Sequence, residues 1–495
     1  MILSDLLACI PDAKCVGNPR VEISGIAHDS RDVKPGCLFV CLVGSKHDGH
    51  DYVHEAIQRG AHAVCVQADR ADALHNLAPL LAVPDTRKAL PHLAAAVHGH
   101  PSRELRLVGV TGTNGKTTTT QLIAAILQAG GLTSGVIGTL GARIGERELP
   151  SAHTTPEADH LQALLREMRA GGAQAVAMEV SSHALAQHRT DACAFDCAVF
   201  TNLTQDHLDF HKDMEDYYAA KRRLFTDYAE WSPEGFVSVI NVDDQWGRRL
   251  SGEASGRLLT YGVLNDADVS AKAIDARADS IRFRAKCPGG DFEARLPFGG
   301  QFQVYNALAA ICAAVGMGVE AECIAAGLAA ARPVPGRFEP VSNDRGFSVI
   351  VDYAHTPDGL ANLLRAARSL KPRRILLVFG CGGDRDRGKR PQMGRLAAEC
   401  ADVAIVTSDN PRTEDPRAII QDILAGMSGG AANLIVESDR REAIRRAIEL
   451  AQEGDIVLIA GKGHETYQIV GSERLPFDDR QVAREVLGRA IAGNA

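Results

Sequence analysis

The sequence lacks the usual features of zinc-binding, membrane-spanning and nucleic-acid-binding proteins. Its 12 cysteines include no Cys-x-x-Cys, and no histidine or cysteine cluster completes a zinc site beside Cys37 and Cys41 or beside Cys193 and Cys197. No apolar run approaches the ~18 residues of a membrane-spanning helix. The net charge of -8 argues against a general nucleic-acid binder. We therefore expect reduced, mostly buried thiols and neither a membrane nor a nucleic-acid partner.

A signal peptide is absent as well. The first residues, Met-Ile-Leu-Ser-Asp-Leu-Leu, contain an early acid and no basic segment. An apolar fraction of 45% and a charged fraction of 23% are typical of globular proteins. The length of 495 residues corresponds to about three domains. Together these features predict a cytoplasmic globular protein with several domains.

A phosphate-binding loop is the most informative motif of the chain. Residues 105–110 form an apolar run of the kind that makes a buried strand, and residues 117–129 have a helical pattern. Gly112 and Gly115 punctuate the turn between them. A strand, a glycine loop and a helix in this order form a cradle, in which backbone N–H groups and the positive end of the helix dipole face phosphates.

The residues at the start of this helix favour the cradle over an ordinary glycine turn. Lys116 would reach the terminal phosphates, and Thr117 directly after it would offer its hydroxyl to Mg²⁺. The usual pattern has a glycine where this chain has Val110, so the literal motif is not met. We predict a tighter variant of the loop. We also predict a single nucleotide site, because no later strand carries Gly-Lys-Thr before a helix.

Strands alternate with helices through most of the chain, which predicts the α/β fold class with parallel sheets covered by helices. We expect a small mixed α/β N-terminal domain (1–101), a central P-loop parallel-sheet domain (102–335) and a C-terminal Rossmann-like doubly wound domain (336–495). The predicted strands are 21–26, 37–43, 63–66, 135–140, 173–180, 197–202, 236–242, 347–353, 374–379, 403–407, 434–436 and 456–459. The predicted helices, besides 117–129, are 53–59, 357–370, 391–400, 416–426 and 440–452.

Polar side chains gather where predicted strands end, which is where parallel sheets bind ligands. Glu179 ends the strand 173–180 and is a candidate Mg²⁺ ligand, because Mg²⁺ prefers oxygen donors. His183 and His207 follow two of the strands. A histidine is more often a structural residue than a ligand, but the position of these two near a nucleotide loop favours a role in the site.

Six short segments carry a family resemblance. They are Thr-Gly-Thr-Asn-Gly-Lys-Thr at 111–117, Glu-Val-Ser-Ser-His at 179–183, Asn-Leu-Thr-Gln-Asp-His at 202–207, Gln-Val-Tyr-Asn-Ala at 303–307, Gly-Arg-Phe-Glu at 336–339 and Asp-Tyr-Ala-His-Thr-Pro at 352–357. In this order they resemble the ATP-dependent Mur ligases of cell-wall precursor synthesis, over nearly the whole chain. The resemblance implies an enzyme that joins an amino acid to a nucleotide-linked carboxylate through an acyl-phosphate, releasing ADP and phosphate.

The resemblance also implies the nucleotide and metal ligands. Lys221 falls where the family carries a carbamylated lysine, and a lysine adds CO₂ only as the neutral amine, which burial or nearby positive charge favours. Without the resemblance, Lys221 is one charge on an amphipathic helix. Mg²⁺ would be held by Thr117, Glu179, His207 and the Lys221 carbamate, and the catalytic residues would be Lys116, His207 and Lys221. ATP would contact Gly112, Thr113, Asn114, Gly115, Lys116, Thr117, Thr118, Asn306, Arg337, Asp352 and His355.

The segment Asp-Asn-Pro-Arg at 409–412 is similar to that of family members that add meso-2,6-diaminopimelate. Arg412 could bind the far carboxylate of this amino acid in a bidentate pair, whereas lysine has no such group. A site that loses a buried polar partner can discriminate by as much as ~10⁴. An Asn-Pro turn with a solvent-facing arginine is the alternative. The resemblance implies an amino-acid pocket of Arg385, Asp409, Asn410, Pro411, Arg412, Gly461 and Glu465.

The nucleotide-linked substrate would be UDP-N-acetylmuramoyl-L-alanyl-D-glutamate. The resemblance implies that it contacts Ser30, Ser45, Lys46, His47, Thr154, Thr155, Ser181, Gln187 and Arg189. We expect a monomer whose partners are this substrate, meso-diaminopimelate and ATP. The rival interpretations are a lysine-adding Mur ligase, a ligase like folylpolyglutamate synthetase, a P-loop switch ATPase and a nucleotide-binding regulatory protein.

Overall fold

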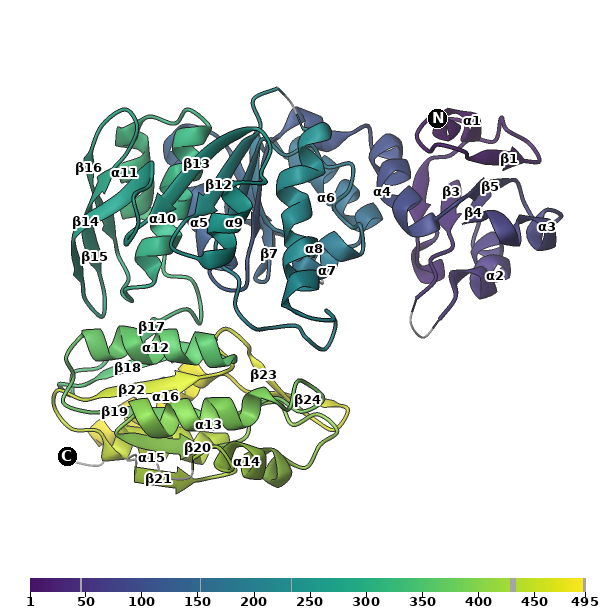
Figure 1. The fold of residues 1–495 in the computed structure, drawn as a ribbon. Helices are drawn as coiled ribbons and strands as arrows, with labels where there is room; N and C mark the ends of the chain where they lie inside the picture. Colours follow the sequence, from purple (N-terminus) through teal and green to yellow (C-terminus); the bar gives the residue numbers. More distant parts are fainter. Residues whose placement is uncertain (45–46, 152, 233, 428–432, 493–495) are drawn as a thin grey trace.

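The computed structural model describes residues 1–495 except 45–46, 152, 233, 428–432 and 493–495. Three sheets follow one another along the chain, each accompanied by helices, and a two-stranded ribbon (β23, Tyr467–Val470; β24, Glu473–Pro476) comes just before the last helix in the sequence (Figure 1). No described helix is long and apolar enough to cross a membrane. The predicted α/β fold class is confirmed.

The first sheet has five strands in the order β1-β5-β4-β3-β2. Its strands are β1 (Lys14–Val16), β2 (Gly25–Ala27), β3 (Cys37–Val40), β4 (Ala63–Gln67) and β5 (Leu80–Val83), with α1 (Leu3–Leu7), α2 (Val53–Gln58) and α3 (Ala71–Leu74) beside them. The strand predicted at 21–26 is wrong in its first half. The backbone there bonds instead to the N-terminal residues, because Val21 O accepts from the Leu3 N–H (2.9 Å) and the Ile23 N–H donates to Met1 O (2.8 Å).

The central sheet has eleven strands in the order β16-β15-β14-β13-β12-β11-β6-β10-β7-β8-β9. Its middle is parallel, as predicted: β6 (Arg106–Thr111), β7 (Ser134–Gly138), β10 (Ala175–Glu179), β11 (Cys197–Phe200), β12 (Val237–Asn241) and β13 (Arg257–Gly262). Both edges carry antiparallel strands that the sequence did not predict. They are β8 (Gly141–Ile144) and β9 (Arg147–Leu149) at one edge, and β15 (Ile281–Lys286) and β16 (Phe292–Leu296), which extend from β14 (Val269–Ala276), at the other.

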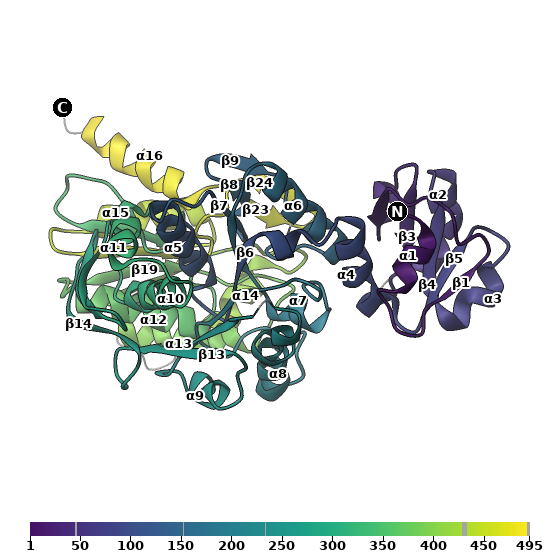
Figure 2. The same ribbon diagram turned by 90° about the horizontal axis from the view of Figure 1, so that it is seen from above.

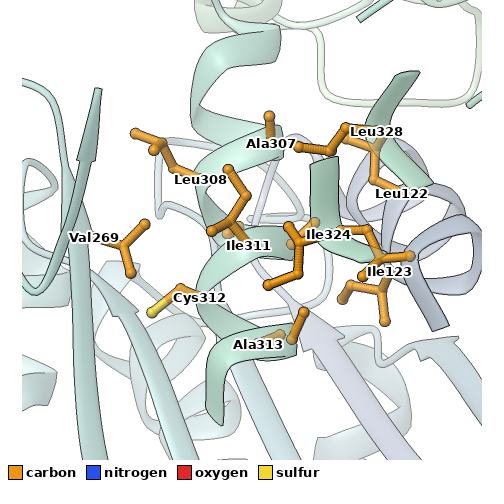
Figure 3. Close-up of a cluster of buried hydrophobic side chains, with 14 of the residues drawn as sticks. Leu122, Ile123, Val269, Ala307, Leu308, Ile311, Cys312, Ala313, Ile324 and Leu328 are labelled. Carbon is orange, nitrogen blue, oxygen red and sulfur yellow. The ribbon is translucent and has the colours of Figure 1, made fainter. Parts of the chain in front are cut away.

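Helices cover both faces of the central sheet. On β10, Ala175 and Ala177 belong to one apolar core while Val176 and Met178 belong to the other, as the two-residue period of a strand requires. Figure 3 shows the first core, in which α5 (Lys116–Ala129), α10 (Gln303–Gly316) and α11 (Ala321–Ala330) interdigitate through residues such as Ile123, Ile311 and Ile324. The second core contains residues of α6 (Ala158–Ala170) and α8 (Met214–Thr226); the short helices α7 (Ser182–Ala186) and α9 (Gln245–Ser251) complete this part.

The third sheet is doubly wound, as predicted, in the order β17-β18-β22-β19-β20-β21. Its strands are β17 (Glu339–Val341), β18 (Ser348–Asp352), β19 (Ile375–Phe379), β20 (Val403–Val406), β21 (Asn433–Val436) and β22 (Ile456–Ala460), all parallel except β17. One core holds α12 (Pro357–Ser369), α13 (Lys389–Cys400) and α14 (Pro416–Leu424), and the other holds α15 (Arg440–Leu450) and α16 (Asp479–Ala492).

The three parts are arranged unevenly. The N-terminal part lies beyond α4 (Thr86–Val97) and projects from the rest of the molecule, as both ribbon views show (Figures 1 and 2). The central and C-terminal parts lie against each other, with α12 on the side of the central part (Figure 1). A hydrogen bond of 2.8 Å from Asn114 to Asp358 joins them. The edge at which these two parts meet is where the phosphate loop lies.

Candidate active site

The strand order brings three loops together at one edge of the central sheet. β6 lies between β10 and β11, and the three strands are parallel. The phosphate loop follows β6, Glu179 ends β10, and residues 201–207 follow β11. Because parallel neighbours end at the same edge, the residues predicted to bind nucleotide and metal become neighbours in space.

Two glycines allow the phosphate loop to approach its neighbours closely. Gly112 and Gly115 have φ values of 147° and 87°, which L side chains rarely adopt. A Cβ atom on Gly112 would clash with the Thr201 hydroxyl, and one on Gly115 would clash with the Asn306 amide. Neither glycine can therefore be replaced without moving the loop or its neighbour.

The other loop residues are held by hydrogen bonds. The Asn114 N–H donates to Asn202 Oδ1 (2.9 Å), and the Thr113 hydroxyl donates to Thr204 O (3.2 Å). Val110, where the usual motif has glycine, is fully buried inside β6. Because β6 continues to Thr111, the loop begins at Gly112, two residues after Val110, which explains why this position tolerates a branched side chain.

Two lysine side chains meet at the carbonyl of Gly112. Lys116 Nζ donates to Gly112 O (2.8 Å) and Thr113 O (2.9 Å). Lys221, which lies on α8 and is 1% exposed, donates to the same Gly112 O (2.9 Å). Burial and the charge of Lys116 lower the pKa of Lys221 well below its usual value, although Asp206 opposes the shift. The environment of Lys221 therefore favours the neutral amine.

Glu179 and His207 present the side chains expected of metal ligands. Glu179 is buried, and its carboxylate accepts hydrogen bonds from the N–H (2.8 Å) and the hydroxyl (3.2 Å) of Thr139, both neutral donors. His207, at a φ of 56°, has its Nε2 atom 3.5 Å from Asp206 Oδ2. Partial burial, opposed by Asp206 and aided by Lys116, lowers the pKa of His207 to about 4. Its imidazole is neutral at pH 7 and can offer a lone pair.

A cavity of about 550 Å³ lies between the central and C-terminal parts. It is lined by residues of the phosphate loop and of α10 from one side and by Arg337, Asp352 and His355 from the other. Arg337 stacks on the Tyr353 ring, with its guanidinium carbon 4.6 Å from the ring centroid, and it donates to the Thr117 hydroxyl (3.4 Å). The predicted ATP contacts that line this cavity are Asn114, Gly115, Thr117, Thr118, Asn306, Arg337, Asp352 and His355.

The segments predicted to bind the amino acid meet at the carboxyl ends of β20 and β22. Asn410, which is 4% exposed, donates to Glu465 (2.8 Å). The ammonium of Lys462, fully buried, donates to Asn410 Oδ1 (3.1 Å) and to Glu465 (2.9 Å). Gly461 has a φ of 117°, and a Cβ there would come within 2.5 Å of the Asp409 carboxylate. Lys462, which the sequence analysis missed, thus fixes two of the predicted residues.

Arg412 and Arg385 flank the same loop. Arg412 adopts a φ of 53°, and its guanidinium donates to Gly383 O (2.7 Å). A Cβ placed on Gly382 would contact Arg412 at 2.9 Å and Arg385 at 3.8 Å, so both side chains border this glycine. Arg385 is exposed, and Pro411 between these segments is buried. The guanidinium of Arg412 and the Cγ atom of Arg385 therefore lie beside the same glycine.

The residues predicted to contact the UDP substrate form two groups. Near the start of α7, the Thr155 hydroxyl donates to Glu179 O (2.9 Å), the Ser181 N–H donates to the Thr155 hydroxyl (3.1 Å), and Arg189 donates to Gln187 (2.6 Å) and to Thr155 O (3.1 Å). Thr154 completes this group through a 3.2 Å hydrogen bond with the Thr139 hydroxyl.

The second group lies in the N-terminal part. The buried Ser30 hydroxyl donates to Glu55 (3.1 Å), and His47 lies at 3.3 Å from the Tyr52 hydroxyl. Ser45 and Lys46 lie outside the described residues. The segment that contains Ser30 contacts the first turn of α6, where Asp159 accepts a hydrogen bond of 2.8 Å from the His28 ring.

Three residues beside the cavity or the two lysines were missed by the sequence analysis. Asp206 influences the pKa of both Lys116 and Lys221. Tyr353 stacks with Arg337, and Asp358 accepts the hydrogen bond from Asn114. Asp206 and Tyr353 lie within recognised segments, next to His207 and Asp352, and Asp358 directly follows such a segment; this adjacency was the available signal, although it does not reveal their contacts.

Comparison with known proteins agrees with this geometry. Three family models match successive parts of the chain: "Mur ligase family, catalytic domain" at residues 22–98, "Mur ligase middle domain" at 110–314 and "Mur ligase, glutamate ligase domain" at 336–463. The chain belongs to the Mur ligase family. The family predicted from the sequence is thereby confirmed, and the protein is a ligase.

Curated relatives of this Mur ligase match it along almost its entire length. A UDP-N-acetylmuramoyl-L-alanyl-D-glutamate--2,6-diaminopimelate ligase of Syntrophomonas wolfei is 49% identical and covers 94% of this chain and 95% of its own. The enzyme of the same name from Caldanaerobacter subterraneus is 44% identical, covering 99% and 100%. A solved structure of a ligase with this name superposes with a TM-score of 0.70 at 34% identity, covering 99% of both chains.

Proposed function

We propose that this Mur ligase adds meso-2,6-diaminopimelate to UDP-N-acetylmuramoyl-L-alanyl-D-glutamate, converting ATP to ADP and phosphate in peptidoglycan precursor synthesis. Relatives named for this reaction match 94–99% of the chain. The observation that carries the proposal is the meeting of Lys116 and Lys221 at the Gly112 carbonyl, one strand away from buried Glu179. A nucleotide switch needs a phosphate loop but has no need of a second, neutralised lysine.

The first chemical step is transfer of the γ-phosphoryl group to the side-chain carboxylate of D-glutamate. In the structure, Lys116 bonds to two loop carbonyls, and with ATP bound its ammonium would turn to the phosphates. Neutralising charge on the transferring group and positioning it supply most of the catalysis in such reactions. The predicted contacts of the C-terminal part, Arg337, Asp352 and His355, would hold the nucleotide from the opposite wall of the cavity.

The donor set around Glu179 fits Mg²⁺. A buried carboxylate that receives only neutral hydrogen bonds can take a cation, and a neutral His207 can complete the set. Thr117, Glu179, His207 and the Lys221 carbamate would hold the metal. When bound, Mg²⁺ neutralises charge on the phosphates.

We also propose that Lys221 is carbamylated. The neutral amine attacks CO₂, an N–C bond forms and one proton leaves, so that an anion replaces a potential cation. Burial beside Lys116 favours this product over the ammonium, because the carbamate attracts Lys116 whereas a second ammonium would repel it.

The amine of diaminopimelate would then attack the acyl-phosphate and expel phosphate. We propose that Arg412 and Arg385 bind carboxylates of the amino acid and that Glu465, which pairs with Lys462 in the structure, receives an amino group. Closure of the C-terminal part would bring this amine to the acyl-phosphate and exclude water. We further propose that residues 1–101 bind the UDP end, 102–335 the ATP and 336–495 the amino acid.

The decisive experiment is phosphate release from ATP with the UDP-linked dipeptide and either diaminopimelate or lysine. We expect turnover with diaminopimelate and at least ~100-fold lower kcat/KM with lysine, because lysine leaves Arg412 without its carboxylate. For Arg412→Ala the preference should fall to within ~10-fold. Equal turnover of both amino acids by the unchanged protein would contradict the Arg412 assignment.

The same assay separates the rival functions. A P-loop switch would release phosphate without any amino acid, and a lysine-adding Mur ligase would reverse the preference between the two amino acids. A folylpolyglutamate synthetase would require folate and glutamate in place of the UDP-linked dipeptide. Each rival therefore has a distinct substrate dependence.

A further inference from the structure

A carboxylate of the C-terminal part binds the phosphate loop directly. Asp358 lies in the first turn of α12, and its Oδ2 atom accepts hydrogen bonds from Asn114 Nδ2 (2.8 Å) and from the Thr204 hydroxyl (3.2 Å). Asn114 belongs to the phosphate loop, and Thr204 belongs to the loop after β11. One oxygen atom is therefore bonded to both loops that frame the cradle.

We propose that Asp358 is a positioning residue that holds the C-terminal part closed over the nucleotide cradle. In the described parts of the chain, three side-chain hydrogen bonds join residues 102–335 to residues 336–495. Asp358 accepts two of them, and Arg337 donates the third to the Thr117 hydroxyl at 3.4 Å. The hydrogen bonding of this joint thus depends chiefly on one carboxylate, which acts beside the packing of Phe302 against Phe338, whose ring centroids lie 5.8 Å apart.

The C-terminal part presents this carboxylate in a fixed orientation. Asn362, one turn further along α12, donates to the same Oδ2 atom (3.1 Å), and the Thr356 hydroxyl caps the helix by accepting the Gly359 N–H (3.1 Å). The first turn of a helix also stabilises a negative charge. Asp358 is thus pre-oriented by its own helix before it meets the central part.

The position of α12 decides where the other nucleotide contacts lie. Asp352 and His355 stand just before this helix, and they line the same 550 Å³ cavity as Asn114 and Asp358. Asn114 links the phosphate loop to α12, because its N–H donates to Asn202 while its side chain donates to Asp358. Ordering of the phosphate loop by a nucleotide and docking of α12 therefore favour each other. The inference rests on the proposed function, because it assumes that ATP binds in this cavity.

The test compares three single variants in ATP binding by calorimetry and in steady-state kinetics. Asp358→Ala should weaken ATP binding and raise the KM for ATP by about 10- to 100-fold, the range expected when hydrogen bonds to a charged group are lost. Asp358→Asn keeps an acceptor and should recover most of this loss. Arg368→Ala is the matched control, because it removes hydrogen bonds of the same helix to Cys400 O and the Asp402 carboxylate, which lie away from the cavity and the central part, and it should stay within ~3-fold of the unchanged protein.

A double-mutant cycle separates positioning from direct nucleotide contact. Thr204→Val and Asp358→Ala should be clearly non-additive in ATP affinity, because both remove the same contact between the parts. Small-angle X-ray scattering with a non-hydrolysable ATP analogue should show a larger radius of gyration for Asp358→Ala than for Arg368→Ala. Additive effects with unchanged scattering would overturn the proposal and make Asp358 a nucleotide ligand.

Two further outcomes would also overturn the proposal that Asp358 holds the C-terminal part closed. ATP affinity within ~2-fold of normal in Asp358→Ala would show that the joint does not depend on this carboxylate. Equal losses in Arg368→Ala and Asp358→Ala would mean that any weakening of α12 lowers ATP affinity and that the contact of Asp358 with the central part has no special role. Failure of the unchanged protein to bind ATP would instead contradict the proposed function, so the two failures are distinguishable.

Discussion

The carbonyl oxygen of Gly112 accepts hydrogen bonds from two lysines, and this shared acceptor sets the electrostatics of the site. The distances are 2.8 Å to Lys116 and 2.9 Å to Lys221, so two ammonium groups at these positions would repel each other. Burial adds to the cost of charging Lys221, which is 1% exposed. A lysine that is costly to charge and lies beside a second lysine is best used as an anion.

Replacement of Lys221 tests this reasoning at the residue scale. We expect Lys221→Ala to lower kcat by at least ~100-fold, the size of effect seen when one electrostatic group is removed from a site. Added acetate or propionate should restore part of the activity, because a small carboxylate can occupy the space of the lost carbamate. Phosphate release measures both effects. Lys212→Ala, which changes an exposed lysine just before α8, is the control. Full activity of Lys221→Ala would refute the carbamate.

The loop between β6 and α5 carries the element-scale prediction. Gly115 has a φ of 87° and a Cβ there would clash with Asn306, whereas Gly131 at the other end of α5 has a φ of 84° and nothing within 4 Å of such a Cβ. Both alanine variants should lose about 1–2 kcal/mol of stability from the left-handed backbone alone. Only Gly115→Ala should also raise the KM for ATP, by at least ~10-fold. Denaturant unfolding and ATP titration of the two variants check this; equal KM values would contradict it.

The element boundaries show what sequence patterns can predict. The strand expected at 105–110 and the helix expected at 117–129 differ from β6 and α5 by one residue at each affected end, because a buried strand and a glycine turn leave unambiguous patterns. The meander of β14, β15 and β16 was missed, although the alternating burial of β15 fits a strand with one buried face. The alternation in β15 is easily missed, because strands alternate with helices through most of the chain.

The candidate site was predictable to the extent that it lies at strand ends. The sequence predicted positions for Glu179 and His207 beside the phosphate loop because parallel strands end together at one edge; their role as metal ligands stays a prediction. Lys221 could be found only through the family resemblance, because its burial depends on how α8 packs on the sheet. Asp358 and Lys462 were missed because their roles arise from contacts with residues 244 and 52 positions away in the chain, which no local pattern records.

At the scale of the whole molecule, two joints connect three sheet-bearing parts. One joint lies between α12 and the phosphate loop, where Asp358 accepts two hydrogen bonds. The other lies between the N-terminal part and the first turn of α6, where the Asp159 carboxylate accepts hydrogen bonds from the N–H (3.1 Å) and ring Nδ1 (2.8 Å) of His28. The two joints differ in chemistry. Only the second pairs a carboxylate with a group that titrates near neutral pH.

This second joint should make stability depend on pH. Burial opposes the charged ring, but the hydrogen bond and charge of Asp159 prevail, so the pKa of His28 is raised, while that of Asp159 is lowered despite burial. The contribution of His28 to the free energy of unfolding is therefore fully present below the ordinary histidine pKa of about 6.5. It is lost as the pH rises through the raised pKa. The contribution of Asp159 is present above the ordinary aspartate pKa of about 3.9 and is lost as the pH falls through the lowered pKa. The pair therefore stabilises the folded protein most between about pH 4 and 6.5.

We expect Asp159→Asn to lower the stability of the joint by about 1.5–3 kcal/mol at pH 6, as for a hydrogen bond to a charged group, and by clearly less at pH 9. The amide can still accept from the His28 N–H, but it no longer favours a charged ring, so only the pH-dependent part of the stabilisation disappears. Calorimetric unfolding at the two pH values measures the difference. Asp32→Asn, which changes a largely exposed carboxylate 3.3 Å from His160 at the same joint, should have an effect below ~1 kcal/mol. An Asp159→Asn effect independent of pH would mean that His28 is neutral throughout and that the joint is held by hydrogen bonding alone.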